Sequence, residues 1–427
     1  MFWEKYLKED SRLIRPLDGY EYFITMSFLY VSDIFDKFDV EVFSKNCKEE
    51  LAKINIFNLG IKKIDNYLFW IKIPFKFILE EIEYNENEEI ENFLKNEENL
   101  PKNMFRIYDE NEKNLERLIM FKICQLKNNK TKLTLFAQHS ICDGRTIFNI
   151  FDLIRKIIQG KKLEKIDDKL CDFGQKSNFN EKLDLNKILS KPKKCEEIPQ
   201  MKLLPKINSP IQMINKHYIY DYIPVKNFCI ENKITIQSML ITTMARAMRK
   251  YFKLPNDTKI YNYTPCDSRA SEFATEERKN KKFFCVSGAL FPFNIYHENI
   301  IEDFKESYKQ LIIAKNNLEN ISQILIGATA VDYTTLKFRD VGIPNTNYAI
   351  TCASHIGKVN GNLPLFGLYY DCSPDNYSYA LHVIHTDEKI IFNALKPMNL
   401  PKDYCDAVKN EMDYVFNLNF MKNNFNK

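Results

Sequence analysis

The stretch from Arg117 to Ile158 constrains the fold more than any other part of the chain. Two apolar runs, Arg117–Leu126 and Thr131–Gln138, are separated by a short polar segment, which is typical of a β-hairpin. Thr146–Ile158 follows, with apolar residues at helical spacing and Gly160 just beyond its end. The sequence therefore predicts a hairpin that leads, through a corner at 139–145, into an amphipathic helix.

Strands and helices alternate along the rest of the chain as well. Before the hairpin we expect strands at Phe23–Val31, Asn66–Ile73 and Phe75–Tyr84, and a helix at Asp39–Ile54 with Asp39 as its N-cap. After it we expect strands at His217–Ile223, Lys259–Tyr263, Cys285–Phe293, Tyr348–Ala353 and Ser378–Ile384, and helices at Thr235–Lys253, Glu302–Asn317 and Asp403–Phe416. This interleaving predicts the α/β class.

The length of 427 residues predicts two to three domains. From Lys161 to about Asn215 the composition shifts to Lys, Asp, Asn and Pro, with few periodic stretches. We interpret this stretch as a crossover linker. The predicted division is an N-terminal domain at 1–160, a linker at 161–215 and a C-terminal domain of comparable size at 216–427.

Charge and hydropathy exclude several classes of protein. Basic and acidic residues are nearly balanced, with a formal net charge of +4. This balance gives no support to a nucleic-acid-binding protein or to one held on an anionic membrane surface. The most apolar stretch, Leu68–Leu79, is short and contains Lys72 and Lys76, so no transmembrane segment is expected. The first ten residues lack the basic-then-apolar order of a signal peptide.

The eleven cysteines are scattered and include no CxxC pair. This usage indicates reduced thiols in a cytoplasmic protein and gives no support to a zinc or thioredoxin-like site. No metal-ligand constellation is visible in the sequence, so we expect no metal. A monomer is our working expectation.

The predicted corner carries the clearest chemistry. A strand delivers His139 to its end, a tight turn follows at Asp143-Gly144, and a helix begins. An imidazole there can act as a general base, since its usual pKa of about 6.5 leaves it mostly neutral in the cytosol. Asp143 can cap the helix or pair with a basic residue. The alternative is that His139 is an ordinary histidine at the end of a strand.

The run His139-Ser140-Ile141-Cys142-Asp143-Gly144 resembles the HxxxDG motif of the chloramphenicol-acetyltransferase-like superfamily. That superfamily includes BAHD acyltransferases, alcohol O-acetyltransferases and the condensation domains of peptide synthetases. Weaker similarities follow in the expected order: Arg15–Glu21 resembles the opening of the alcohol acetyltransferase branch, Tyr261–Arg269 a strand that ends in D-x-R, Phe284–Leu290 a "hydrophobic-G-N" segment, and Ala353–Val359 an "S-N-x-G-x-V" strand end.

The resemblance implies two similar α/β sandwich domains around a central channel, with acyl-CoA as co-substrate and no permanently bound cofactor. His139 would be the general base that activates an alcohol or amine acceptor. Asp143 would be structural, in a salt bridge with Arg269 or, as second choice, Arg145, and Gly144 would permit the tight turn.

The resemblance also implies three candidates in the C-terminal domain. Ser354 would steady the oxyanion, and His355 and Ser287 are candidates for lining the channel.

Several positions depart from the family pattern. Gln138 replaces the first histidine of the HHxxxDG form typical of condensation domains, which favours a CoA-dependent enzyme. Ser287-Gly288 and His355 replace the expected "G-N" and "N", and the plant-type DFGWG is missing near the C-terminus. Two alternatives therefore stay open: a donor thioester on a carrier protein, and a catalytically inactive member that binds a ligand.

The remaining histidines have structural interpretations. His382 and His385 lie three residues apart in a predicted strand, which puts them on opposite faces and argues against a shared metal site. His217 and His297 are expected to be structural. The sequence contains no Gly-rich phosphate loop, GxSxG elbow or HExxH motif.

Overall fold

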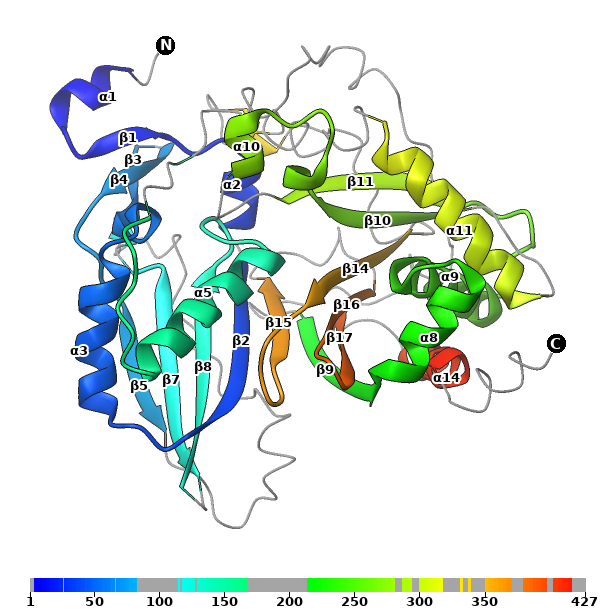
Figure 1. Cartoon of the computed structure of the whole chain (residues 1–427). Coiled ribbons are helices and arrows are strands. Elements are labelled where there is room, and N and C mark those ends of the chain that lie inside the picture. The colour runs from blue at the N-terminus through cyan, green and yellow to red at the C-terminus, as the bar shows by residue number, and fades with distance from the viewer. Residues whose placement is uncertain are drawn as a thin grey trace.

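The computed structural model shows two lobes, one built mainly from each half of the chain (Figure 1). It describes residues 4–25, 27–65, 67–82, 114–115, 117–126, 129–166, 170, 213–280, 286–293, 299–317, 331–332, 337–338, 350–370, 379–397 and 402–416. No helix in these ranges combines the length and the apolar character that a membrane span requires. The acidic stretch after Ile82, most of the predicted linker and His297 lie outside the described residues.

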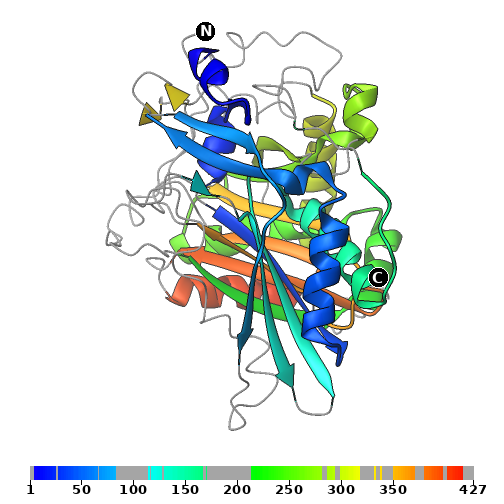
Figure 2. The ribbon, with the colours of Figure 1, turned by 90° about the vertical axis from the view of Figure 1, so that its left-hand side faces the viewer.

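The N-terminal lobe is built on a five-stranded sheet that contains the predicted hairpin. Its strand order is β15-β2-β8-β7-β5, with β2 at Ser27–Asp36, β5 at Ile78–Ile82, β7 at Ile119–Leu126, β8 at Lys130–Gln138 and β15 at Leu365–Tyr370. The helices α3 (Val40–Leu51) and α5 (Gly144–Ile158) cover one face (Figure 2). Asp39 caps α3 as predicted, through a bond from the Val42 N–H at 2.9 Å.

A smaller sheet lies beside it in the order β1-β4-β3-β6. Its strands are β1 (Leu13–Pro16), β3 (Leu59–Ile64), β4 (Tyr67–Lys72) and β6 (Asn114–Leu115), and α1 (Glu4–Glu9) precedes them. The predicted strand at Phe23–Val31 is wrong in its first part, because α2 occupies Gly19–Ile24. A short apolar run fits either element. Here the backbone N–H of Glu21 donates to the Asp18 carboxylate at 2.8 Å, which starts the helix.

The C-terminal lobe is built on a six-stranded sheet in the order β11-β10-β14-β16-β17-β9. The strands are β9 (Met213–Asp221), β10 (Ile260–Asp267), β11 (Val286–Phe293), β14 (Ile350–Lys358), β16 (Ala380–His385) and β17 (Lys389–Pro397); the main helices are α8 (Tyr222–Asn232), α9 (Ile236–Phe252), α11 (Ile300–Lys315) and α14 (Lys402–Phe416). The buried Arg246 of α9 pairs with Asp303 of α11 and Glu411 of α14, which ties the three helices together.

The two lobes share a strand, which the predicted division at 160 and 216 did not anticipate. β15 comes from the C-terminal half but pairs antiparallel with β2 of the N-terminal sheet. The buried Asp33 of β2 holds the connection from β14 to β15. Its carboxylate accepts hydrogen bonds from the N–H groups of Asn362 (3.1 Å) and Leu363 (2.8 Å), and it forms an ion pair with Arg155. The N-terminal lobe therefore includes residues 365–370 as well as the early part of the chain.

The C-terminal sheet separates two hydrophobic cores. Along β16, Ala380 and Ile384 belong to the core that both lobes share, whereas Leu381 and Val383 belong to the core of the C-terminal lobe. Because side chains alternate along a strand, one face of this sheet looks toward the N-terminal lobe and the other toward α9. The face on which a residue lies therefore decides whether it can meet the corner at His139.

Candidate active site

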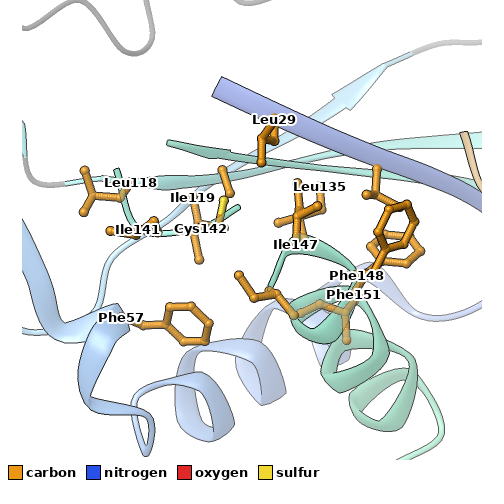
Figure 3. Packing of buried hydrophobic residues seen from close by; sticks show 14 of the residues in the cluster. Leu29, Phe57, Leu118, Ile119, Leu135, Ile141, Cys142, Ile147, Phe148 and Phe151 are labelled. Atoms are coloured by element: carbon orange, nitrogen blue, oxygen red, sulfur yellow. The ribbon is translucent and has the colours of Figure 1, made fainter. Parts of the chain in front are cut away.

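The predicted corner exists and is anchored by backbone hydrogen bonds. The His139 N–H donates to the carbonyl of Ser27 at 3.0 Å, and the Cys142 N–H donates to the carbonyl of His139 at 3.3 Å. Ile141 and Cys142 turn into the shared core, where Figure 3 shows them near Leu118 and Ile119. We call residues 138–144 the His139 corner. Its backbone is held on both sides, so the imidazole leaves it in a defined direction.

Gln138 is the side chain that ties this corner together. Its Nε2 donates to the Thr25 carbonyl at 2.5 Å, and its Oε1 accepts from the Ser140 N–H at 2.9 Å and the Ser140 hydroxyl at 3.1 Å. The carboxamide therefore serves as donor and acceptor at once, and it is fully buried. The residue that departs from the HHxxxDG form thus has a structural role in this chain.

Asp143 and Gly144 start helix α5. The Asp143 carboxylate accepts from the N–H groups of Arg145 at 3.0 Å and Thr146 at 2.7 Å, which is N-capping as predicted. A Cβ on Gly144 would lie 3.1 Å from Cδ1 of Ile356, on β14 of the other lobe. Gly144 therefore allows the two lobes to approach closely at this point.

The His139 ring is partly exposed, with one nitrogen turned inward. Nδ1 is buried and has no hydrogen-bond partner among the described residues, so Nε2 is the nitrogen that a substrate can reach. Burial lowers the pKa of His139 below its usual value, while nearby backbone of His139 and Cys142 and the Asp143 carboxylate oppose the shift. The ring is therefore neutral near pH 7, which is the form that accepts a proton.

The Arg15–Glu21 segment is connected to the His139 corner through a buried ion pair and a hydrogen bond. Arg15 and Glu21 form a buried, two-pronged ion pair with both N–O distances at 2.7 Å. This pair holds α2, and the next residue, Thr25, supplies the carbonyl that Gln138 binds. The segment is thus linked to the corner through Thr25 and Gln138.

Arg269 and Arg145 are the predicted salt-bridge partners of Asp143. Arg269 forms its ion pair with Asp267, at 2.7 Å, because the D-x-R spacing at the end of β10 brings the two side chains together. A salt bridge between Arg269 and Asp143 stays a prediction. Arg145, the second choice, donates from its guanidinium to the Lys358 carbonyl at 2.6 Å and so links α5 to the end of β14.

Across from the corner, the C-terminal sheet presents Ser354 and His382. They are direct neighbours on β14 and β16, on the face that looks toward the N-terminal lobe, and each is 8% exposed. The ring of Phe366 packs edge-on against the ring of His382, with the ring centroids 5.8 Å apart. The same phenyl ring lies close to Gly144 at the start of α5. We call Ser354 and His382 the facing pair.

The pKa of His382 is lowered to about 4, chiefly by burial and further by the proximity of His139. The two imidazoles are thus close enough that a proton on one disfavours a proton on the other. Both are neutral near pH 7. No motif in the sequence indicates a role for His382, whose only signal is a histidine in an otherwise apolar strand.

His355 lies on the other face of the sheet, so it and Ser354 do not share one surface. Its Nε2 lies 3.1 Å from Nδ1 of His385, and His385 stacks on Tyr222 with ring centroids 4.2 Å apart. Burial lowers the pKa of His355 to about 4. His382 and His385 therefore occupy opposite faces, as predicted.

Ser287 lies on β11, where its backbone pairs with Cys266 of β10. β10 separates it from β14. Its role as a channel residue stays a prediction. Within the described ranges, no group of three or more His, Cys, Asp or Glu side chains is placed to hold a metal ion.

The geometry above belongs to a known two-lobed fold. The chain is similar to the epimerization domain from the third module of tyrocidine synthetase B (TM-score 0.65, 9% identity, 98% of this chain and 100% of that one). It is also similar to the condensation domain from Monacolin K polyketide synthase (TM-score 0.63, 12% identity, 96% and 97%) and to trichothecene 15-O-acetyltransferase from Fusarium sporotrichioides (TM-score 0.59, 11% identity, 94% and 95%).

No family model and no curated protein matches the sequence. The structural similarity thus extends over nearly the full length of all three solved structures at very low identity. The chain has the two-lobed α/β fold of these three solved structures.

Proposed function

We propose that this protein is an acyltransferase that moves an acyl group from a thioester to an alcohol or amine, with His139 as general base. The observation that carries the proposal is the His139 corner. It holds a neutral, partly exposed imidazole on rigid backbone between two lobes. The shared fold with condensation domains and an acetyltransferase supports this reaction class.

In the proposed reaction, Nε2 of His139 accepts the proton of the acceptor hydroxyl or amine as its oxygen or nitrogen attacks the thioester carbonyl. The new C–O or C–N bond forms, and the C–S bond breaks. The proton then passes from His139 to the thiolate, which leaves as a free thiol. Holding both substrates in one site supplies much of the rate enhancement.

We propose acyl-CoA, with an acetyl group as the first candidate, as the donor and co-substrate, with no permanently bound cofactor or metal. Gln138 in place of a second histidine supports a CoA-dependent reaction over a condensation-type one. A carrier-bound donor is the second candidate, because several solved structures of similar fold are domains of peptide or polyketide synthases. A binding protein without turnover is the third. A cytoplasmic location is part of the proposal.

The test is release of free thiol from acetyl-CoA and longer acyl-CoAs with a panel of alcohols and amines, in wild type and His139→Ala. We expect acceptor-dependent release that falls by a factor of about 100 to 10,000 in the variant, which is the usual contribution of a general base. Equal release in both proteins would remove His139 from the mechanism. Release only from carrier-loaded donors would establish the second candidate, and ligand binding without any release would establish the third.

A further inference from the structure

Ser354 and His382, the facing pair, are polar residues in an otherwise hydrophobic environment. Ser354 and His382 lie on a strand face whose other residues, such as Ala380, Ile384 and Ile356, pack in or against the shared hydrophobic core. Nδ1 of His382 is buried with no hydrogen-bond partner among the described residues. A buried polar atom without a partner lowers stability, so a hydrophobic side chain would serve the fold better here.

The ring of His382 nevertheless has one usable nitrogen. Because Nδ1 is sealed by packing, Nε2 is the atom through which this side chain can interact. The Ser354 hydroxyl is its direct neighbour across the two strands, and the structure gives it no hydrogen bond within the described ranges. Both groups therefore keep a free hydrogen-bonding position on the same face.

That face is the one opposite His139. The proximity of His139 contributes to the low pKa of His382, and Phe366 packs against both His382 and the start of α5. The nucleophile and the oxyanion are different substituents of one tetrahedral carbon, so the oxyanion donors must lie near the reacting atom at a place that the base does not occupy. A lobe that faces the base across the site can supply such donors. Neutral donors in a poorly solvated site are well suited to stabilise that charge.

We propose that His382, together with Ser354, donates a hydrogen bond to the oxyanion of the tetrahedral intermediate. This assignment rests on the acyltransferase function proposed above. His382 acts as a neutral donor through Nε2–H, with Nδ1 unprotonated, and takes no proton during the reaction. The C-terminal lobe thus supplies charge stabilisation, while the N-terminal lobe supplies the base.

The test compares kcat and KM for thiol release in wild type and His382→Phe. A group that acts only in the transition state lowers kcat and leaves KM unchanged. We expect kcat to fall about 100-fold, the usual effect of losing one oxyanion donor, with KM within about threefold of wild type. His382→Gln, which can present an amide N–H at a similar position, is expected to keep kcat within about tenfold.

His385→Phe is the matched control, because it changes the same residue type on the same strand but on the opposite face. Its kcat is expected to stay within about twofold of wild type. The unfolding midpoint of His382→Phe is expected to equal or exceed that of wild type, since the variant removes an unpartnered buried polar atom.

Three results would overturn the assignment: a rise in KM with kcat unchanged, an equal loss of kcat in His385→Phe, or wild-type kcat in His382→Phe. These outcomes are separable from failure of the proposed function, because His139→Ala is measured in the same series. Loss of turnover in His139→Ala with wild-type rates in His382→Phe would contradict only the assignment of His382 as an oxyanion donor. Wild-type rates in both variants would sink the acyltransferase mechanism and this inference together.

Discussion

The His139 corner and the facing pair lie on opposite sides of the same site, and they are built in different ways. In the corner, backbone groups and the Gln138 carboxamide bond one another, so polar groups fix a direction. In the facing pair, His382 and Ser354 sit on a regular strand with hydrogen-bonding capacity to spare. The first arrangement positions a side chain, whereas the second leaves positions open for a ligand.

The comparison teaches that burial alone does not identify a functional group. His217 is also buried, with a pKa lowered to about 4, but its Nε2 lies 2.8 Å from the Phe366 carbonyl, which gives the ring a structural role. His382 has no such bond among the described residues. The two histidines therefore differ in Nε2, which has a hydrogen-bond partner in His217 and none among the described residues in His382.

The largest expected effect tests the support beneath the corner. Glu21→Ala leaves the buried Arg15 guanidinium without its ion-pair partner, so we expect a loss of about 3–5 kcal/mol in the free energy of unfolding. Chemical denaturation measures this directly. Arg12→Ala is the control, since it breaks the exposed Arg12–Asp10 pair and should cost less than about 1 kcal/mol. Similar losses in both variants would contradict a special role for the buried pair.

The next effect tests the facing pair through pH. The pKa of His382 is about 4 in the folded protein and about 6.5 when unfolded, so the unfolded state alone gains this proton as pH falls below 6.5. Stability is therefore lost on acidification, by about 2 kcal/mol at about pH 5 for this residue. We expect His382→Phe to lose about 2 kcal/mol less than wild type between about pH 7 and about pH 5. Equal losses would show that His382 is not held neutral.

A smaller effect tests how the corner is fixed. Gln138→Ala leaves the Ser140 N–H and the Thr25 carbonyl without their partner, and we expect a loss of about 1–2 kcal/mol in stability. Because His139 is adjacent, kcat should fall as well. Gln125→Ala, which removes a bond to Thr131 far along the same hairpin, should leave kcat unchanged. If Gln138→Ala were fully active, the corner would not depend on this carboxamide.

The smallest effect tests the contact between the two regions. Arg145→Ala removes an exposed bond to the Lys358 carbonyl, so we expect a loss of about 0.5–1 kcal/mol and a change in kcat within about threefold. Lys358→Ala keeps that carbonyl and is the matched control. A much larger loss of activity in Arg145→Ala than in the control would mean that this contact sets the spacing between the lobes.

The N-terminal part of the site could be predicted from the sequence because its determinants are local. The hairpin, the corner and helix α5 lie within one continuous stretch, with turn, cap and periodicity signals in order. Asp143 as N-cap is confirmed for the same reason. Misplaced parts, such as α2, come from apolar runs too short to distinguish a helix from a strand.

The C-terminal part could not be predicted, because it depends on which strands become neighbours. Nothing local indicates that β15 joins the N-terminal sheet or that Ser354 meets His382 across two strands. The alternation rule predicted that His382 and His385 face opposite ways, but not which of them would face His139. The low pKa values also arise from tertiary burial, which no motif reports.

The pH dependence of kcat/KM for acyl transfer, from about pH 4.5 to about pH 8, tests the central claim most directly, because it reports the ionisation of the base in the free enzyme. Since burial lowers the pKa of His139, the account predicts activity that is lost on acidification with a midpoint below 6.5, and no such limb in the residual activity of His139→Ala. A midpoint at or above 6.5, or the same limb in His139→Ala, would contradict it.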